Sequence, residues 1–169
     1  MGCALDVRWL EGSLAIERGR FADYRELERF HYVAKRPAVW AGVWRAVYRR
    51  DDDVRTVAVG VLSHPVPSCA ARQSALRLSG ARYEAGRIRW LNANLRTISR
   101  VIVHPQFRGI GVAGELVRVI CAESGVRYVE AMAQMGSVVP LFERGGMTRR
   151  TCGAGKPSYY LWDRANPSH

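Results

Sequence analysis

The residues best placed to do chemistry form one short run, HPQFRGIGVAGEL, at residues 104–116. A β-branched, strand-like segment over 97–105 leads into this run, and a helix-like apolar segment follows it. Gly109 and Gly111 permit a tight turn, because glycine has no Cβ. At the start of a helix the first backbone N–H groups have no partner within the helix, and with the helix dipole they attract anions. The run therefore predicts an anion cradle suited to a pyrophosphate, with Arg108 adding positive charge beside it.

Two other interpretations of this run stay open as minor alternatives. The string GIGVAG at 109–114 matches the G-x-G-x-x-G of dinucleotide sites, and Glu130 lies about 20 positions further on. However, no further strand-helix-strand repeat follows, as such a site would need. A plain structural turn is the second alternative. A P-loop is excluded, because its Gly-Lys-Ser/Thr would need a lysine that this run lacks.

The elements before the cradle are predicted from their hydrophobic period. We expect an amphipathic helix over 21–31, a strand over 38–48, a polar turn at 49–53 and a second strand over 55–65. From Val66 to about Leu95 the sequence has some helical character early and no clear period later. A long connection of this kind is either a functional lid or binding loop, or a peripheral excursion.

The elements after the cradle complete a β-α-β unit. A helix is expected over 111–125, with Gly125 just past its end. A strand over 126–133, a short helix over 137–146 with Gly145 as its stop signal, and a strand over 158–163 follow. Together these elements predict a mixed α/β (α+β) fold, formed by a single domain over 1–169.

The charge of the chain favours anionic partners. Lysine and arginine total 26 against 15 acidic residues, which gives a net charge of +11 and a pI near 10.3. Such a surface suits nucleic acid or a phosphate-rich cofactor. A compositional bias toward arginine on a solvated surface is the other explanation, and composition does not separate the two.

Several classes of protein are not expected from this sequence. It has no run of 18 apolar residues, so we predict no membrane span. The first residues do not read as a secretory signal, and Asp6 stands where a myristoylation motif needs Ser or Thr. The four cysteines lack the spacing of a metal site or a disulfide framework. We therefore expect a cytoplasmic protein without a metal.

Two segments resemble the signatures of the GCN5-related N-acetyltransferase superfamily. ISRVIVHPQFRGIGVAGELV at 98–117 resembles its acyl-CoA motif, and PLFERGGM at 140–147 resembles its second signature. The resemblance covers about residues 97–150, and the amino-terminal half matches only in the order of its elements. It implies a central mixed, mostly antiparallel sheet flanked by helices. It also implies acetyl-CoA or another acyl-CoA as cofactor, and direct attack of an amine on the thioester.

The resemblance also implies roles for particular residues. The main chain of Val101 and Val103 would bond the pantetheine arm, between this strand and the one over 128–133. A strand amide near Val101 would polarise the acyl carbonyl, as an oxyanion hole does. Backbone amides at the cradle would hold the CoA pyrophosphate. These amides belong to Arg108, Gly109, Ile110, Gly111, Val112 and Ala113.

The general acid and base are less clear. In the family the acid is frequently a tyrosine, where this chain has Phe142, so either Ser137 serves or the thiolate leaves unaided. Several relatives have a carboxylate where this chain has Thr97. Glu130, the only acidic residue on a predicted central strand, is the first candidate base, and an ion-paired strand residue is its alternative. His31 is the second, since a histidine can accept a proton near neutral pH, although it can equally cap the helix end.

Three functions are compatible with these patterns. The leading hypothesis is an acyl-CoA-dependent N-acyltransferase with an unidentified amine acceptor. The charge exceeds what one CoA needs, so the acceptor in a second hypothesis is nucleic acid, with the arginines of 72–96 contacting phosphate. That acceptor would be DNA adenine, as in related phage DNA-modification proteins, or aminoacyl-tRNA. A third hypothesis is a domain that binds CoA without turnover. A homodimer is also left open.

Overall fold

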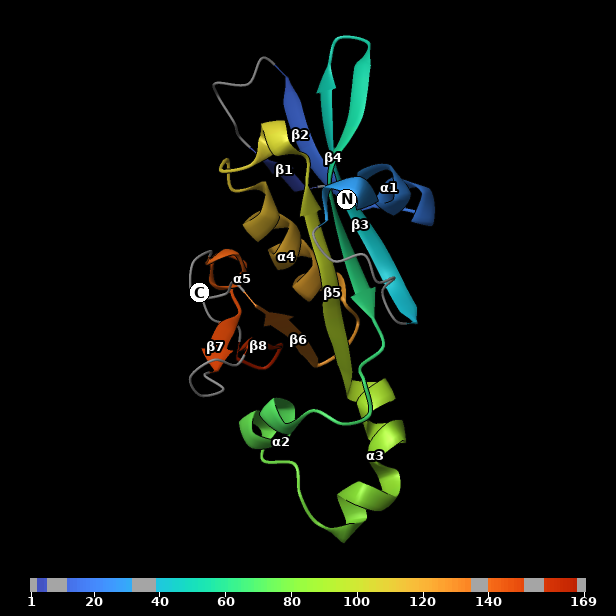
Figure 1. Ribbon diagram of the computed structural model, residues 1–169, viewed down its shortest axis with the longest axis vertical. Coiled ribbons are helices and arrows are strands. Elements are labelled where there is room, and N and C mark those ends of the chain that lie inside the picture. The colour runs from blue at the N-terminus through green and yellow to red at the C-terminus, as the bar shows by residue number, and fades with distance from the viewer. Residues whose placement is uncertain (1–2, 6–11, 32–38, 135–139, 151–156, 167–169) are drawn as a thin grey trace.

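A computed structural model describes residues 3–5, 12–31, 39–134, 140–150 and 157–166 (Figure 1). Its strands form one eight-stranded sheet in the order β1-β2-β3-β4-β5-β6-β8-β7. All neighbouring strands are antiparallel except β5 and β6. The expected mixed, mostly antiparallel sheet is confirmed. The strands are β1 (Cys3–Leu5), β2 (Ser13–Arg18), β3 (Trp40–Arg50), β4 (Asp53–Ser63), β5 (Leu95–Val103), β6 (Tyr128–Ala133), β7 (Thr148–Arg150) and β8 (Ser158–Asp163).

Helices cover both faces of the sheet. Side chains alternate along β4, so that Val59 and Val61 pack with α1 whereas Ala58 and Leu62 pack in the cluster that contains α4. The connection between β4 and β5 lies at the end of the molecule opposite the β3–β4 turn (Figure 1). The helices are α1 (Phe21–Leu27), α2 (Ala70–Leu76), α3 (Ala81–Asn94), α4 (Val112–Glu123) and α5 (Leu141–Arg144), with 3₁₀ turns at Glu28–Phe30 and Pro105–Phe107.

Helix α4 lies very close to the sheet and to the end of α5 because of a glycine in β4 and a glycine just after α5. A Cβ on Gly60 of β4 would stand 2.4 Å from Cδ1 of Ile120, which is fully buried on α4. A Cβ on Gly145, just after α5, would stand 2.3 Å from Val117. These contacts leave no room for a larger residue at either position. They fix the depth of α4, and with it the position of its first turn at the end of β5.

The first helix brings His31 to the same end of β5. Tyr24 and Leu27 of α1 are buried against the sheet, in a cluster with Ile102 of β5. The α-helix ends at Leu27, earlier than the predicted 31, and a 3₁₀ turn continues to Phe30. His31 follows directly after this turn.

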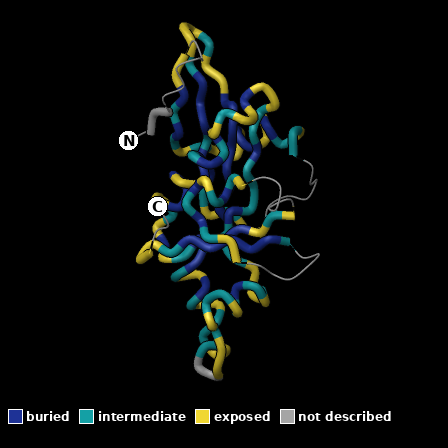
Figure 2. Tube along the Cα trace, turned by 90° about the vertical axis from the view of Figure 1, so that its left-hand side faces the viewer, coloured by how far each residue is buried: buried dark blue, intermediate teal, exposed yellow. Residues whose placement is uncertain are grey.

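The connection between β4 and β5 contains two helices, α2 and α3. Helix α2 lies in the early part, for which the sequence predicts some helical character, whereas α3 lies in the part predicted to have no clear period. The prediction missed α3 because this helix buries little. Leu91 is its only fully buried side chain among those described, and most of its length is intermediate or exposed (Figure 2). Trp90 links α3 to the sheet, with its ring centroid 6.1 Å from that of Tyr128 on β6.

Other boundaries differ in detail from the sequence predictions. Strands β3 and β4 have the predicted length of 11 residues each, but both lie two residues closer to the turn than predicted. The turn between them is thereby reduced to Asp51 and Asp52, with Asp51 at a φ of 50°. Helix α5 ends at Arg144 with Gly145 as its C-cap, as predicted, and Gly146 follows with a φ of 81°. Strands β1, β2 and β7 were not predicted. The final strand over 158–163 and Gly125 just past the end of α4 were predicted correctly.

The described ranges contain no helix with the length and apolarity to cross a membrane. They also contain no group of three or more His, Cys, Asp or Glu side chains that could hold a metal ion. Cys121 is a core residue of α4, and burial raises the pKa of its thiol to about 12. That thiol is therefore unreactive at neutral pH.

Candidate functional site

The site begins where β5 and β6 separate. The two strands pair in parallel over only four positions, from Leu95 with Tyr128 to Ile98 with Ala131. Strand β5 then continues to Val103, and its other side stays paired with β4 as far as Ala58. Within the described ranges, β5 has no strand partner on the β6 side beyond Ile98. The sheet therefore opens on one side of β5.

The main chain of Val101 and Val103 faces this opening. The N–H of His104 donates to the carbonyl of Val57 on the β4 side, at 2.8 Å. In a strand, the N–H and C=O of one residue point to the same side, and those of the next residue point to the opposite side. Since His104 bonds β4, the N–H and C=O groups of Val103 and Val101 point away from β4. Among the described residues, Nε of Arg108 donates to the Val103 carbonyl from this side at 3.2 Å. The pantetheine prediction places the amides of that arm along the same side of these two residues.

A β-bulge interrupts β5 just after the separation point. Arg100 pairs with Val61 and Ile98 with Leu62, so Ser99 has no opposite residue on β4. The Ser99 hydroxyl lies 3.2 Å from the carbonyl oxygen of Val61, to which it can donate. Bulges bend a strand and redirect its groups, and they are frequent beside active sites. Here the bulge lies between the paired segment of β5 and its open segment.

The turn after β5 has the conformation that its glycines predict. Gly109 and Gly111 have φ angles of 83° and 91°, in the left-handed region that favours glycine. Gly111 is the N-cap of α4, so the next N–H groups, from Val112 onward, lack an acceptor within the helix. A Cβ placed on either glycine would meet no atom within 4 Å. The space in front of the turn is therefore large enough for an anionic group, and the N–H groups beside it suit one.

Arg108 contributes to this turn differently from the prediction. Its backbone N–H already donates to the carbonyl of Pro105 at 3.3 Å, so the cradle of amides begins at Gly109. Its guanidinium Nε donates to the carbonyl of Val103 at 3.2 Å. The side chain thus places a positive charge between the turn and the open edge of β5.

These elements enclose a cleft of about 540 Å³, which we call the β5–α4 cleft. Its wall comes from the end of β5, the glycine turn, the start of α4, and Leu141 and Arg144 on α5. Most of the predicted cofactor residues line it, and Ile110 is the exception. A volume of this size is usual for a small-molecule site. Val101, Val103 and the glycines therefore share one site, as the sequence predicts.

His31 lines the same cleft, on the α1 side together with Phe30. The Phe30 ring is held by the His104 ring, with centroids 4.9 Å apart. Of the three predicted catalytic residues, His31 is the one that the structure brings to the open edge of β5. Ser137 lies outside the described residues.

Glu130 lies in a different environment, which does not suit the predicted role of base. Its side chain is 3% exposed and does not line the β5–α4 cleft. It accepts hydrogen bonds from Nε and Nη2 of Arg72 at 2.9 and 2.7 Å, from the Tyr159 hydroxyl at 2.9 Å and from the Thr97 hydroxyl at 2.7 Å. A carboxylate has about four acceptor positions, so this one is fully engaged. The ion-paired alternative describes Glu130 better.

The partners of Glu130 connect α2 to the sheet. Arg72 on α2 is 1% exposed, and its Nη1 also donates to the carbonyl of Val66 at 2.8 Å. Burial tends to lower the pKa of Arg72, but its hydrogen bonds to Glu130 and the charge of that carboxylate raise it overall. Burial, and then the charge of Glu130, raise the pKa of Tyr159 as well. The cluster is thus a buried ion pair with neutral donors, placed where β5 and β6 separate.

Phe142 is buried on α5, where its ring packs on Tyr160 with centroids 5.0 Å apart. The Tyr160 hydroxyl donates to Glu143 at 3.2 Å. No tyrosine is among the described residues that line the β5–α4 cleft. The described part of the site therefore offers no phenol as general acid.

Comparison of the sequence finds no matching family model and no matching curated protein. Solved structures do match. NAA60 of Arabidopsis thaliana in complex with acetyl-CoA is 15% identical and superposes with a TM-score of 0.60 over 90% of this chain and 99% of that chain. The GNAT domain of S. lividans PAT is 14% identical, with a TM-score of 0.58 over 96% of each chain.

A putative arylalkylamine N-acetyltransferase of the yellow fever mosquito is 11% identical, with a TM-score of 0.56 over 96% of this chain and 92% of that one. At such identities the likeness is one of fold. It covers nearly the whole of each chain, including the amino-terminal half, where the sequence matched only in the order of its elements.

Proposed function

The chain has the fold of the GCN5-related N-acetyltransferases, and on that premise we propose that it transfers an acyl group from acyl-CoA to an amine. The observation that carries the proposal is the continuity of the β5–α4 cleft. In this cleft the open main-chain edge of β5 leads directly to the glycine turn and the N-terminus of α4. A ligand with an amide-containing arm and a pyrophosphate matches these two parts in that order.

Each part of the cleft has a role in this proposal. The amides from Gly109 to Ala113 hold the pyrophosphate, assisted by the α4 dipole and the Arg108 guanidinium. The main chain of Val101 and Val103 bonds the pantetheine arm in the manner of an added strand. This places the thioester near the bulge at Ser99, where a strand amide near Val101 polarises the carbonyl.

Acyl-CoA supplies the activated carbonyl. The amine nitrogen forms a bond to the carbonyl carbon and the bond from carbon to sulfur breaks, so the products are an amide and CoA thiol. The proton that the amine loses balances the one that the thiolate gains. The protein has to orient the two reactants, stabilise the carbonyl oxygen and carry this proton.

His31 is the residue we assign to the proton. Its position in the wall of the β5–α4 cleft supports this assignment, because a histidine can exchange a proton near neutral pH. Glu130, in contrast, is assigned a positioning role. Its carboxylate accepts hydrogen bonds from Arg72 of α2, Thr97 of β5 and Tyr159 of β8, and so holds these three elements together. A separate acid is not required, since a thiol with a pKa of about 8.5 leaves readily as the thiolate near neutral pH.

The test is a pair of measurements on the intact chain. Calorimetric titration with CoA measures binding, and release of free thiol from acetyl-CoA in the presence of amines measures turnover. We expect both. Absence of CoA binding would refute the proposal. Saturable CoA binding without thiol release for any amine, tRNA or DNA would favour the non-catalytic alternative.

A further inference from the structure

We propose that the acceptor is a small amine that also carries an oxyanion group, a phosphate or a carboxylate, bound by arginines in a second cavity beside α2. This inference rests on the proposed function and names the substrate class. The second cavity has a volume of about 860 Å³, within the range of roughly 300–1,000 Å³ typical of small-molecule sites. We call it the α2–β7 cavity. Its wall comes from α2 and the segment before it, Met132 on β6, Arg149 and Arg150 on β7, and Pro157.

The α2–β7 cavity and the β5–α4 cleft are both lined by residues close to the point where β5 and β6 separate. Met132 in the cavity wall directly follows Ala131, the last residue of β6 that pairs with β5. Ala131 pairs with Ile98 of β5, and Val101, which lines the cleft, lies three residues further along β5. A thioester held near the bulge is therefore within reach of a ligand that enters from the cavity.

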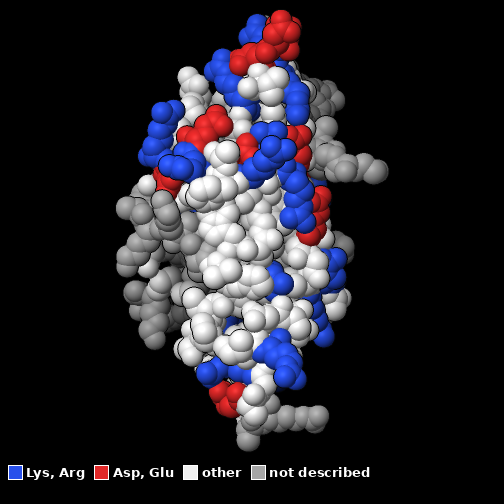
Figure 3. Space-filling view, turned by 90° about the vertical axis from the view of Figure 1, so that its right-hand side faces the viewer, with Lys and Arg blue, Asp and Glu red and all other residues white. Residues whose placement is uncertain are grey.

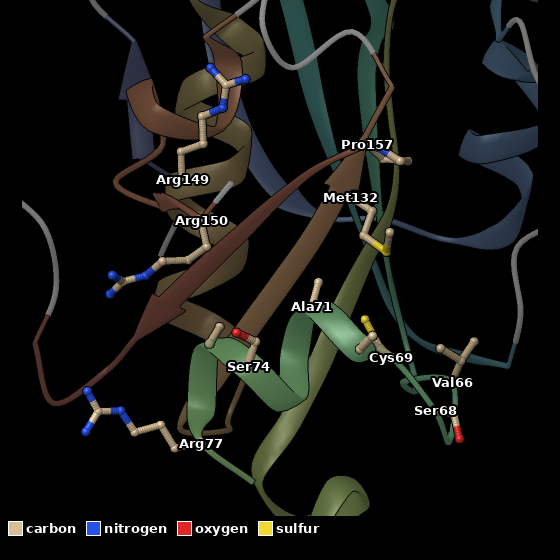
Figure 4. A pocket seen from close by; sticks show the side chains of 12 residues that line it. Val66, Ser68, Cys69, Ala71, Ser74, Arg77, Met132, Arg149, Arg150 and Pro157 are labelled. Atoms are coloured by element: carbon tan, nitrogen blue, oxygen red, sulfur yellow. The ribbon is translucent and has the colours of Figure 1, made fainter. Parts of the chain in front are cut away.

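The two ends of the cavity differ in chemistry (Figure 4). Cys69 and Met132 line the end near β5, beside Pro157. Arg77, from the end of α2, and Arg150, from β7, extend toward the opposite end. A ligand that places its amine near Met132 would thus place a group at its far end among the arginines.

The charge of the cavity selects an anion for that far group. Three arginines line the cavity, and none of its described lining residues is acidic. The Glu130 carboxylate does not line the cavity, because it is buried and paired with Arg72 of α2. Arg149 is tied to the sheet edge, where its Nη2 donates to the Ser158 hydroxyl at 2.8 Å. Guanidinium groups bind phosphate and carboxylate through paired hydrogen bonds, whereas a diamine would bring its second ammonium against like charge.

A small ligand fits these observations better than a nucleic acid does. The three arginines concerned line one cavity between α2 and β7, whose volume suits a small molecule. On the face of the molecule shown in Figure 3, arginines in the upper part are interspersed with acidic side chains, and an uncharged area lies below them. A nucleic-acid surface would instead present continuous positive charge along the path of a strand.

The test compares ligands on protein saturated with CoA, by calorimetric titration. The oxyanion probes are phosphoethanolamine, glutamate and AMP. Putrescine and ethanolamine are the comparison amines, whose far group is a second ammonium or an uncharged hydroxyl. A short single-stranded oligonucleotide represents a nucleic-acid acceptor. We expect an oxyanion amine to bind at least about 10-fold more tightly than putrescine or ethanolamine. Arg77→Glu/Arg150→Glu should weaken that binding by about 10-fold or more. Thiol release from acetyl-CoA should follow the same order.

The matched control is Arg25→Glu/Arg55→Glu, which makes the same change in net charge at exposed arginines of α1 and β4. It should leave oxyanion binding within about 2-fold, and both double variants should keep wild-type affinity for CoA. Stronger binding of putrescine, no binding of any oxyanion probe, or equal effects of the two double variants would overturn the inference. Binding of the oligonucleotide alone would also overturn it, in favour of a nucleic-acid acceptor. Failure of wild-type protein to bind CoA is a separate result, which refutes the proposed function.

Discussion

The β5–α4 cleft takes most of its wall from one run of chain, Val101–Gly114, whereas the α2–β7 cavity takes its wall from four separate segments. In the first, the shape follows from local geometry: a strand, two glycines with positive φ and a helix N-terminus. In the second, the shape depends on α2 staying on the sheet. The contact that holds it there, Arg72 with Glu130, joins residues 58 positions apart.

This difference implies that the two sites respond differently to mutation. A change in the run at 101–114 should affect the cleft and leave the rest of the fold intact, because that run organises itself. A change in the Arg72 cluster should affect the cavity through the stability of the molecule. Four predictions test this contrast.

The largest effect is expected at Arg72. Arg72→Met leaves the Glu130 carboxylate buried without its counter-charge, which should lower the free energy of unfolding by about 3–5 kcal/mol. Denaturant titration measures this loss. The double variant Arg72→Met/Glu130→Met should recover much of it, since no charge then stays buried. Arg55→Met, at an exposed pair with Asp53, should cost far less, because water and salt screen that pair. Equal losses at Arg72 and Arg55 would show that the buried pair does not hold α2.

Gly111→Glu should abolish the cradle without unfolding the protein. The new side chain points into open space, where it brings a negative charge to the pyrophosphate position. Loss of two charge-assisted hydrogen bonds, at about 1.5–3 kcal/mol each, lowers the affinity for CoA at least about 100-fold. Calorimetry measures the affinity. Gly125→Glu is the matched control, because it has the same positive φ and open surroundings at the other end of α4. If the two variants bind CoA alike, the cradle is not where we place it.

His31→Gln should separate catalysis from binding in the cleft. Removal of a general base typically costs a factor of about 100 or more in rate. We expect kcat to fall by roughly that factor while CoA affinity stays unchanged, and the decline of kcat/KM on the acidic side of its pH profile to disappear. Steady-state rates across pH measure both. A variant that retains the acidic decline would assign the proton to another group.

The smallest effect is expected from modification of Cys69, which lines the α2–β7 cavity. Alkylation with N-ethylmaleimide adds bulk at the end of the cavity nearest β5. We expect it to lower thiol release several-fold and to leave CoA affinity within about 2-fold, since the cleft lies on the other side of the separation point. Cys69→Ala protein should resist this inactivation. Inactivation of that variant to the same degree would place the reactive thiol elsewhere.

The contrast between the two sites also explains what the sequence could predict. Gly109, Gly111 and the helix after them encode their geometry in consecutive residues, so the turn and the role of α4 could be inferred together. The opening beside β5 was implied only by the family resemblance. The fold could be inferred for the same segment, through the resemblance of 98–117 and 140–147. The boundaries of β8 and the end of α4 followed from local signals.

What could not be predicted depends on contacts between distant residues. Helix α3 has almost no buried face of its own, so the sequence shows no helical period there. Strand β2 is a different case, because its buried Leu14 and Ile16 alternate with more exposed residues in a pattern that the sequence does contain. The role of Glu130 depends on Arg72, which no local pattern connects to it. The sequence raised an ion pair only as an alternative, and it did not identify the partner.

The open edge of β5 has a consequence for how the protein behaves in solution. An exposed row of main-chain N–H and C=O groups is a template on which another chain can add a strand, which is the usual route to aggregation. A ligand whose amides pair with Val101 and Val103 covers that template, and any ligand that binds the folded state also raises its stability by mass action. The substrate would then act as a folding aid, and yields of soluble protein would depend on how much of it the host supplies.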